Sequence, residues 1–418
     1  MRTRWAILTI AAALLVGGGA WLLRMRLSPR EPTVRIVGTR LFESVFSHVR
    51  SYAVDSLDDQ ELYRRAAAGV IDELDDPYAE LLLPGGPGAR SENAPAPLGL
   101  FLDRRDGAII VVATVPGSPA ESAGVRSGDR LVGVDSVPLD ATRLDLALRR
   151  LDGPADSRVL LRVRRTGTAE TLALAAVRRP VVLGQPIALE MLSGGIARVR
   201  VRRFVPGLAD TIERRLDGLR GKGLHGIALD LRGVVGGLLA DGVALADLFL
   251  GPGQRLATSR SRDPRLSRAF RDSTVSPFDS LPLAVLVNGG TAGAAEAAAG
   301  ALQDHDRGAV LGSMTFGRGV TMQTYPLGQG AAIRLTTALW VTPSGREIQR
   351  APLRSDGDSV PRPRRKTDAG RTVLGGGGII PDREVADTGT SDLVLAEARS
   401  LLIRAGTTRG VMALLARW

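Results

Sequence analysis

The 418-residue chain contains no cysteine, and its only lysines are Lys222 and Lys366. The lack of cysteine excludes disulfides and thiolate metal sites. The three histidines, His48, His225 and His305, do not have the spacing of metal ligands, so we expect no metal and no other cofactor. Aromatic residues make up only 4% and are not interleaved with a basic patch, so we expect no nucleic acid partner.

The net charge of +11 therefore comes almost entirely from arginine. These arginines are scattered along the expected strands and helices, which indicates mainly solvated surface. Apolar residues make up 44% and charged residues 24%, as is typical of a globular chain. A length of 418 residues is enough for two or three domains with buried cores.

Residues 1–27 contain one uncharged apolar run, Trp5 to Leu23, with arginines on both sides. As a helix this run spans about 28 Å, close to the ~30 Å hydrocarbon core of a bilayer, and it is longer than the usual apolar core of a signal peptide. The small residues Gly17-Gly18-Gly19-Ala20 are compatible with a cleavage site. Two interpretations stay open: an anchor that crosses the membrane through residues 5–23, or a signal peptide that is removed.

Residues 28–92 are expected to form a helical segment followed by a linker. Between Val37 and Leu83 the apolar residues recur at helical spacing until Asp76-Pro77 interrupts the pattern. The members of this pattern are Leu41, Val45, Val49, Tyr52, Leu62, Ala66, Val70 and Leu74. Glycine, proline and alanine then dominate Pro84 to Pro97, which indicates a linker.

A second pattern begins with an apolar strand from Ala108 to Val115. The turn–helix–turn strings that follow are Val115-Pro116-Gly117-Ser118-Pro119-Ala120-Glu121-Ser122-Ala123-Gly124-Val125 and Ser127-Gly128-Asp129-Arg130-Leu131. They resemble bacterial PDZ domains, and we place such a domain at 93–181. The resemblance implies that protein C-termini bind by adding a strand to its sheet.

Four consecutive residues stand where PDZ domains carry their carboxylate-binding loop: Leu98, Gly99, Leu100 and Phe101. Glycine in such a loop lets backbone N–H groups turn toward an anion. Leu144 and Leu148 place an apolar stripe on the helix that would form one wall of the peptide groove. Ordinary core packing explains the same two leucines, so both interpretations stay open.

Residues 182–385 alternate strands, glycine turns and helices, which predicts an α/β domain, and residues 386–418 read as a helical tail. The strings that carry family information run in order along this part of the chain. They are Asp230-Leu231-Arg232, Asn288-Gly289-Gly290-Thr291-Ala292-Gly293-Ala294-Ala295-Glu296, Thr315-Phe316-Gly317-Arg318-Gly319 and Thr342-Pro343-Ser344-Gly345-Arg346. Together they resemble the S41 peptidases, the carboxyl-terminal processing or tail-specific proteases. The resemblance implies a crotonase-like core (the ClpP/crotonase fold) within a multidomain α/β plus β protein. It also implies that the part after the N-terminal segment lies outside the cytoplasmic membrane, in the periplasm or the exterior.

The resemblance also implies the site, and two reacting groups differ from the family pattern. The nucleophilic serine of the family falls on Gly293, which has no side chain, and its general-base lysine falls on Arg318. A guanidinium has a pKa above about 12, so it stays protonated and cannot act as a base near neutral pH. The supporting glutamine is matched to Gln323, one residue later than in the family. Gly236, Gly237 and Ala294 are the expected oxyanion donors.

We therefore expect an inactive homologue that binds protein tails, either to hold substrates or to modulate an active relative. The expected partners are protein C-termini, with an active S41 relative or a second copy in a homo-oligomer as further candidates. The competing class is an active serine-type endopeptidase of exported proteins with an unconventional nucleophile such as Thr291. Ser313 and His305 also lie near the site in sequence as substitute groups. A third interpretation is a structural remnant that binds no tails.

Overall fold

The computed structural model describes residues 32–55, 57–74, 76–84, 95–140, 144–168, 170–272, 275–350, 362–385 and 392–415. The chain divides into two compact units, residues 1–73 and residues 74–418. No helix in the described ranges combines the length and apolar character needed to cross a membrane. The apolar run at residues 5–23 lies outside these ranges.

The first unit contains two helices, α2 (Pro32–Tyr52) and α3 (Asp59–Asp72). The Asp58 carboxylate caps α3 by accepting a hydrogen bond from the Glu61 N–H at 2.7 Å. Leu41, Val45, Val49 and Tyr52 recur along one side of α2 as predicted, and all four are exposed. The helical periodicity is therefore confirmed, but these side chains are not part of a core within the described residues.

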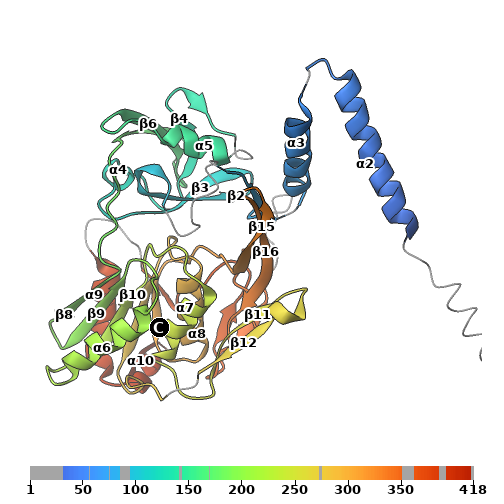
Figure 1. The fold of residues 1–418 in the computed structure, drawn as a ribbon. Coiled ribbons are helices and arrows are strands. Elements are labelled where there is room, and N and C mark those ends of the chain that lie inside the picture. The colour runs from blue at the N-terminus through green and yellow to red at the C-terminus, as the bar shows by residue number, and fades with distance from the viewer. Residues whose placement is uncertain are drawn as a thin grey trace, which may run out of the picture. The chain divides into compact units, whose positions relative to one another are not determined.

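The second unit contains a six-stranded antiparallel sheet (Figure 1). Its strand order is β2-β3-β4-β6-β7, with β5 paired to β4, so β2 lies at an edge. The elements are η2 (Pro97–Gly99), β2 (Leu100–Arg105), β3 (Ala108–Thr114), α4 (Pro119–Ser122), β4 (Arg130–Val134), β5 (Val137–Pro138), α5 (Leu144–Leu151), β6 (Arg158–Arg164) and β7 (Thr171–Val177). The alternating residues of β6 that face α5 are buried, as the pattern of a half-covered strand requires.

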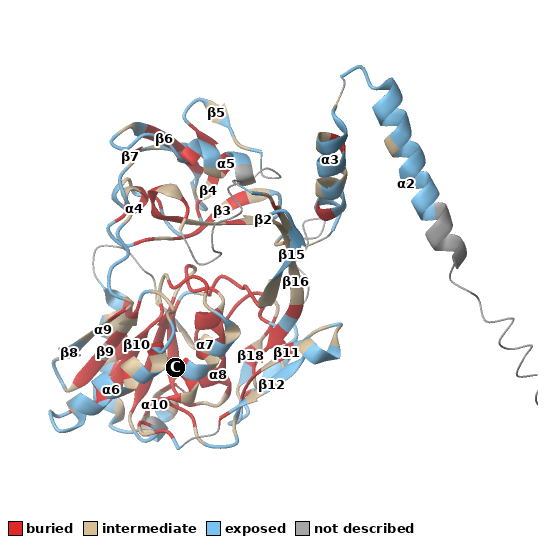
Figure 2. Cartoon of the chain, viewed as in Figure 1, coloured by how far each residue is buried: buried red, intermediate tan, exposed pale blue. Residues whose placement is uncertain are grey.

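A second six-stranded sheet has the order β19-β14-β13-β10-β9-β8 and is parallel except for the β8–β9 pair. Its elements are β8 (Ile187–Leu192), β9 (Ile196–Val201), α6 (Leu208–Arg220), β10 (Gly226–Asp230), α7 (Leu239–Asp247), β13 (Leu283–Val287), α8 (Ala294–Asp304), β14 (Ala309–Gly312), β19 (Arg383–Glu384), α9 (Leu393–Ala405) and α10 (Thr408–Leu415). Every residue of β10 and β13 is buried (Figure 2). One face of these strands packs with α6, α7 and α8, and the other with α9 and α10. Coverage on both faces explains why the strands read as continuous apolar runs.

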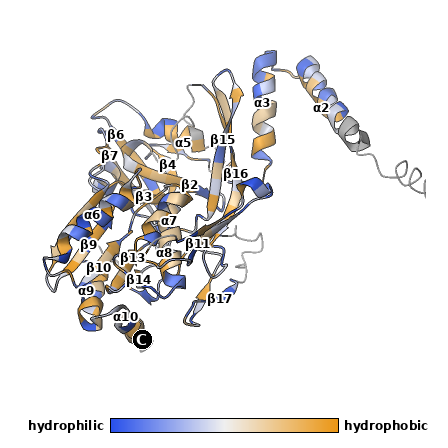
Figure 3. Ribbon diagram, turned by 60° about the horizontal axis from the view of Figure 1, so that its bottom comes forward, coloured by the Kyte–Doolittle hydropathy of each residue, from blue (hydrophilic) through white to orange (hydrophobic). Residues whose placement is uncertain are grey.

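A third sheet has the order β1-β16-β11-β12, with β15 paired to β16. The remaining elements are β1 (Glu80–Leu82), β11 (Arg255–Arg260), η3 (Pro264–Leu266), β12 (Arg268–Arg271), β15 (Val320–Gly328), β16 (Ala331–Val341), β17 (Arg364–Lys366) and β18 (Thr372–Leu374). Hydrophobic residues dominate α8 and β13 at the centre, whereas α6 carries many hydrophilic residues (Figure 3). The buried start of α8 and the loop before β15 meet at the candidate site.

Candidate active site

Gly293 occupies the turn between β13 and α8 and is the residue that precedes the helix. Its backbone has φ 73° and ψ −122°, a conformation that residues with a side chain adopt only under strain. A Cβ atom at this position would lie 3.3 Å from the Gly236 carbonyl oxygen, a tight contact that would require the backbone at Gly236 to shift by a few tenths of an ångström. Glycine therefore relieves backbone strain here and leaves no nucleophilic atom.

The fully buried carboxylate of Glu296, in the first turn of α8, organises both parts of the site. One oxygen accepts hydrogen bonds from the N–H groups of Gly293 at 3.0 Å and Arg318 at 2.8 Å. The other accepts from the Gly317 N–H at 2.7 Å and from the Thr315 hydroxyl. Burial raises the pKa of Glu296, and these hydrogen bonds oppose that shift. Positions 293 and 318, predicted to belong to one site, are thus tied to the same carboxylate.

The Arg318 side chain is directed to β2, the edge strand of the first six-stranded sheet. Its Nη2 donates to Asp103 Oδ2 at 2.8 Å, and the two side chains are only 10% and 5% exposed. The guanidinium also lies 5.6 Å from the ring centre of Tyr78 and 5.5 Å from that of Phe316. Burial raises the pKa of the Tyr78 phenol, and the nearby charge of Asp103 adds to this effect. Arg318 is therefore a buried cation that joins β2 to the loop before β15.

A second contact between the sheet and this loop lies beside the ion pair. The Arg105 guanidinium stacks 3.7 Å from the ring centre of Phe316 and donates to the Phe316 carbonyl at 3.1 Å. The apolar side chains around it form one cluster: Val112, Ala113, Val235, Ala292 and Phe316, with Phe101 and Ile110 packed against them. Phe101, predicted to contact a bound peptide, is half-buried and packs against this cluster.

The predicted oxyanion donors lie together in the turn before α7 and at the start of α8. The Ala294 N–H donates to the Gly236 carbonyl at 3.2 Å, so in this conformation it is not directed toward a substrate. Gly236 and Gly237 both have positive φ, and a Cβ at Gly237 would lie 2.7 Å from the Phe204 ring. These glycines are therefore required by a tight turn, whether or not an oxyanion binds there.

Thr291 is fully buried, and its hydroxyl is already bonded twice. The hydroxyl donates to the Leu231 carbonyl at 2.9 Å and accepts from the Asn288 N–H at 3.0 Å. Both bonds stabilise the turn, so this hydroxyl is not available for attack in this conformation. The two ring nitrogens of His305 each form a hydrogen bond of 2.7 Å, Nδ1 with the Asp368 carboxylate and Nε2 with the Arg255 carbonyl. Ser313, the other substitute group considered, is exposed.

Gln323 lies within β15, where its Oε1 accepts a hydrogen bond from the Tyr325 hydroxyl at 2.7 Å. A different glutamine supports the loop: Gln349 Oε1 accepts from the Gly319 N–H at 2.9 Å. Reasoning from sequence missed Gln349, Tyr78 and Asp103. Only Asp103 had a visible signal, a carboxylate within the apolar start of a predicted sheet.

Most of the predicted peptide-binding side chains are packed into the domain core. Leu98 and Leu100 are buried in the core of the first six-stranded sheet, and Leu144 and Leu148 are half-buried against it, which favours the core-packing interpretation. Gly99 has φ 79°, and a Cβ there would lie 2.4 Å from the Ser118 Cβ, so only glycine fits. A ligand at Leu98, Gly99 and Leu100 would therefore contact mainly backbone N–H and C=O groups.

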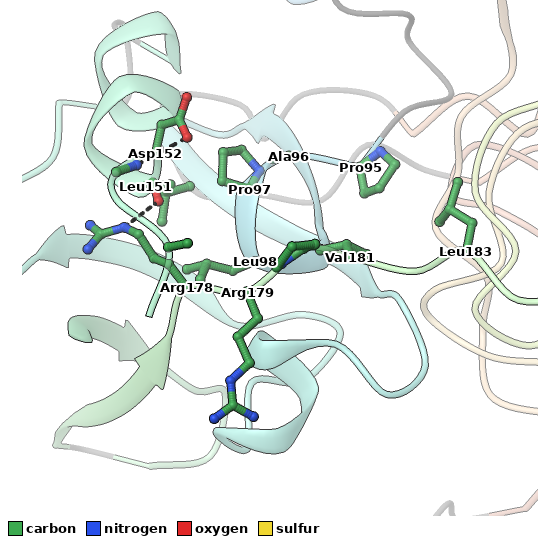
Figure 4. A pocket seen from close by; sticks show the side chains of 13 residues that line it. Pro95, Ala96, Pro97, Leu98, Leu151, Asp152, Arg178, Arg179, Val181 and Leu183 are labelled. Carbon is green, nitrogen blue, oxygen red and sulfur yellow. Dashed lines mark hydrogen bonds between the residues drawn. The ribbon is translucent and has the colours of Figure 1, made fainter. Parts of the chain in front are cut away.

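A cavity of about 460 Å³ lies beside this loop (Figure 4). Its walls are Pro95 to Leu98, the C-terminal end of α5 and the segment 178–183. Arg178 donates to the Leu151 carbonyl at 3.0 Å and so supports one wall. Among the residues that the structure describes, no group of three or more His, Asp or Glu side chains could hold a metal ion.

Comparison with known proteins identifies the class. Residues 195–358 match peptidase family S41, and residues 110–165 match a PDZ domain. The chain is 32% identical over 314 residues to a carboxy-terminal-processing protease of Bartonella bacilliformis, covering 74% of this chain and 72% of that one. It is 29% identical over 337 residues to the carboxyl-terminal-processing protease of Synechocystis, covering 77% and 78%.

Among solved structures, a photosystem II D1 C-terminal processing protease shares the fold. The TM-score is 0.67 at 24% identity, over 86% of this chain and 90% of that chain. The chain therefore belongs to the S41 family of carboxy-terminal processing proteases and contains a PDZ domain, as its sequence motifs predicted.

Proposed function

We propose that this S41 family member binds the C-terminal tails of proteins and does not cleave them. The observation that carries the proposal is the pair of residues at the two reacting positions. Gly293, matched to the nucleophilic serine, offers no hydroxyl. Arg318, matched to the general-base lysine, is held in a buried ion pair with Asp103 at 2.8 Å.

Acyl transfer needs an attacking oxygen and a neutral base within hydrogen-bond reach of it. A guanidinium keeps its proton, and a carboxylate partner favours the charged form further. In a different serine protease, loss of the nucleophile alone lowers kcat by about a million-fold. The internal bonds of the Thr291 hydroxyl argue against the alternative of a relocated nucleophile.

Tail binding is supported by the PDZ domain. β2 is an edge strand of its sheet, so a bound tail can pair with it as an added strand. The cavity of about 460 Å³ beside Leu98 is large enough for the last side chain of the tail. We further propose that the protein acts outside the cytoplasmic membrane, with residues 5–23 as anchor or removed signal. An active S41 relative or a second copy of the chain remains a candidate partner.

Binding and cleavage can be measured on the same samples. Unfolded reporter peptides with apolar C-termini are titrated with the protein and followed by fluorescence anisotropy, and the mixtures are then examined by mass spectrometry. We expect saturable binding without new peptide termini. The matched control is a reporter with an amidated C-terminus, which should bind much more weakly because its carboxylate is gone. Cleavage by the native chain that disappears in Thr291→Ala would establish the active alternative instead.

Filling the cavity tests where the tail binds. Ala155 lines the cavity and is exposed, so Ala155→Trp should obstruct it without disturbing the core. Ala269→Trp places the same side chain at an exposed position of β12 and is the matched control. Equal tail affinity in both variants would show that the cavity is not the binding site.

A further inference from the structure

The outer face of the PDZ sheet carries an unusual concentration of one charge. All charged residues of β4, β6 and β7 are arginines: Arg130, Arg158, Arg162 and Arg164. Arg158, Arg162 and Arg164 are exposed and alternate along β6 with the buried Val159, Leu161 and Val163. Cross-strand register places Arg130 opposite Arg164 and Arg162 opposite Gly133, so all four lie on the same face. We call these four residues the arginine face.

The arrangement does not serve the stability of the sheet. Arg130 and Arg164 are direct cross-strand partners, and like charges in such positions destabilise a sheet. Within the part of the chain that the structure describes, none of the four arginines forms an ion pair with a carboxylate. The four charges are therefore not neutralised inside this domain, and they are concentrated where a partner can reach them.

A hollow of about 250 Å³ lies at the Arg130–Arg164 pair. The turn that follows β6 completes it with Arg165, Thr166, Gly167 and Thr168. The nearby carboxylate of Asp129 is only 1% exposed. It accepts hydrogen bonds from Nε and Nη2 of Arg165, each at 2.8 Å, and from the Arg126 N–H at 2.9 Å. It does not compensate Arg130 or Arg164, so the hollow suits a phosphate-sized anion.

We propose that the arginine face docks on an anionic lipid bilayer, with the hollow receiving a headgroup phosphate. A guanidinium group can donate two parallel hydrogen bonds to one phosphate, and it retains its charge at any physiological pH. Leu160 is 38% exposed on β6 between Arg158 and Arg162, and its apolar side chain fits the interfacial region of a bilayer.

The neighbouring strand favours a lipid surface over single-stranded nucleic acid. The residues of β7 opposite Leu160, Arg162 and Arg164 are Ala175, Ala173 and Thr171, so this part of the face has small side chains between its arginines. The strands β4, β6 and β7 contain no aromatic residue on which nucleic acid bases could stack. A sheet face of this kind, basic with one apolar side chain, matches a surface of closely spaced phosphates.

Because the chain has no native cysteine, one engineered cysteine can be labelled without background. Ala175 on β7 is exposed and lies opposite Leu160. A nitroxide label attached to Ala175→Cys therefore reports on the arginine face. The full chain is reconstituted with phosphatidylcholine bilayers, with or without 30% phosphatidylglycerol, and the access of a water-soluble relaxation agent to the label is measured. Binding through other parts of the chain does not mimic this signal. Ala269→Cys on β12 is the control site.

We expect the label at position 175 to be protected only with the anionic lipid, and the protection to disappear as salt is raised. In this background, Arg158→Gln/Arg162→Gln/Arg164→Gln should weaken the interaction on the order of a hundredfold, at about fivefold for each arginine. Arg214→Gln/Arg215→Gln/Arg268→Gln removes the same charge from exposed positions of the peptidase core and should have little effect.

Three results would overturn the proposal: a label that stays accessible with the anionic lipid, equal protection by the neutral lipid, or stronger protection by duplex DNA than by bilayers. The salt titration needs no arginine variant, so it decides the question even if the triple variant folds poorly.

Discussion

The ion pair between Arg318 and Asp103 should stabilise the contact between the PDZ sheet and the peptidase core. The side chains are 10% and 5% exposed, so solvent screens the pair little, and removing either partner takes a nearby opposite charge away from a buried ion. We expect Asp103→Val and Arg318→Met each to lower the free energy of unfolding by about 3–5 kcal/mol. The double variant replaces the pair by apolar side chains and should recover most of that loss.

The measurement is a double-mutant cycle from urea unfolding, with hydrogen exchange of β2 and of residues 315–319 as local reporters. The exposed pair Arg265–Asp263, with side chains 86% and 34% exposed, is the matched control and should show no measurable coupling. If the two single effects at Asp103 and Arg318 add within about 0.5 kcal/mol, the pair does not connect the two domains and our account of Arg318 is wrong.

Gly293→Ser alone should lower stability by about 1–3 kcal/mol, because the positive φ strains any side chain, and should give no cleavage; the control Gly218→Ser lies at an exposed α6 position without positive φ. Gly293→Ser together with Arg318→Lys should restore measurable peptide cleavage if the scaffold is intact, and continued silence would show that the turn itself has changed. Burial opposes the charged form of Asp392, but hydrogen bonds and charges from arginine side chains outweigh it and lower the pKa of Asp392. Its contribution to stability is therefore present above the unfolded pKa near 3.8 and is lost as pH falls through the folded value. The hydrogen-exchange protection factors of α9, corrected for the intrinsic exchange rate at each pH, should fall in acid, and less so in Asp392→Asn, which lacks this titration.

Much of the fold was predictable because its patterns are local. The alternation in β6, the continuous apolar runs of β10 and β13 and the glycine turns before α7 and α8 each depend on neighbouring residues in the chain. The helical segment was also predicted, but its exposed apolar side, including Leu41 and Val45, was not. A periodic pattern shows which side of a helix is apolar and does not show what covers it.

The sequence alone determined the chemistry available at Gly293 and Arg318, the two positions that we match to the nucleophile and the base of the family. Glycine has no nucleophile and arginine keeps its proton, and both facts follow from the chemistry of single residues matched to family motifs. Only the tertiary structure decided how those positions are used. It paired Arg318 with Asp103, which lies 215 residues earlier in the chain, and buried the Thr291 hydroxyl in the turn. It also placed Arg130 of β4 beside the three arginines of β6 on one face of a sheet. Contacts between distant segments depend on strand register and packing, which no local pattern of residues encodes.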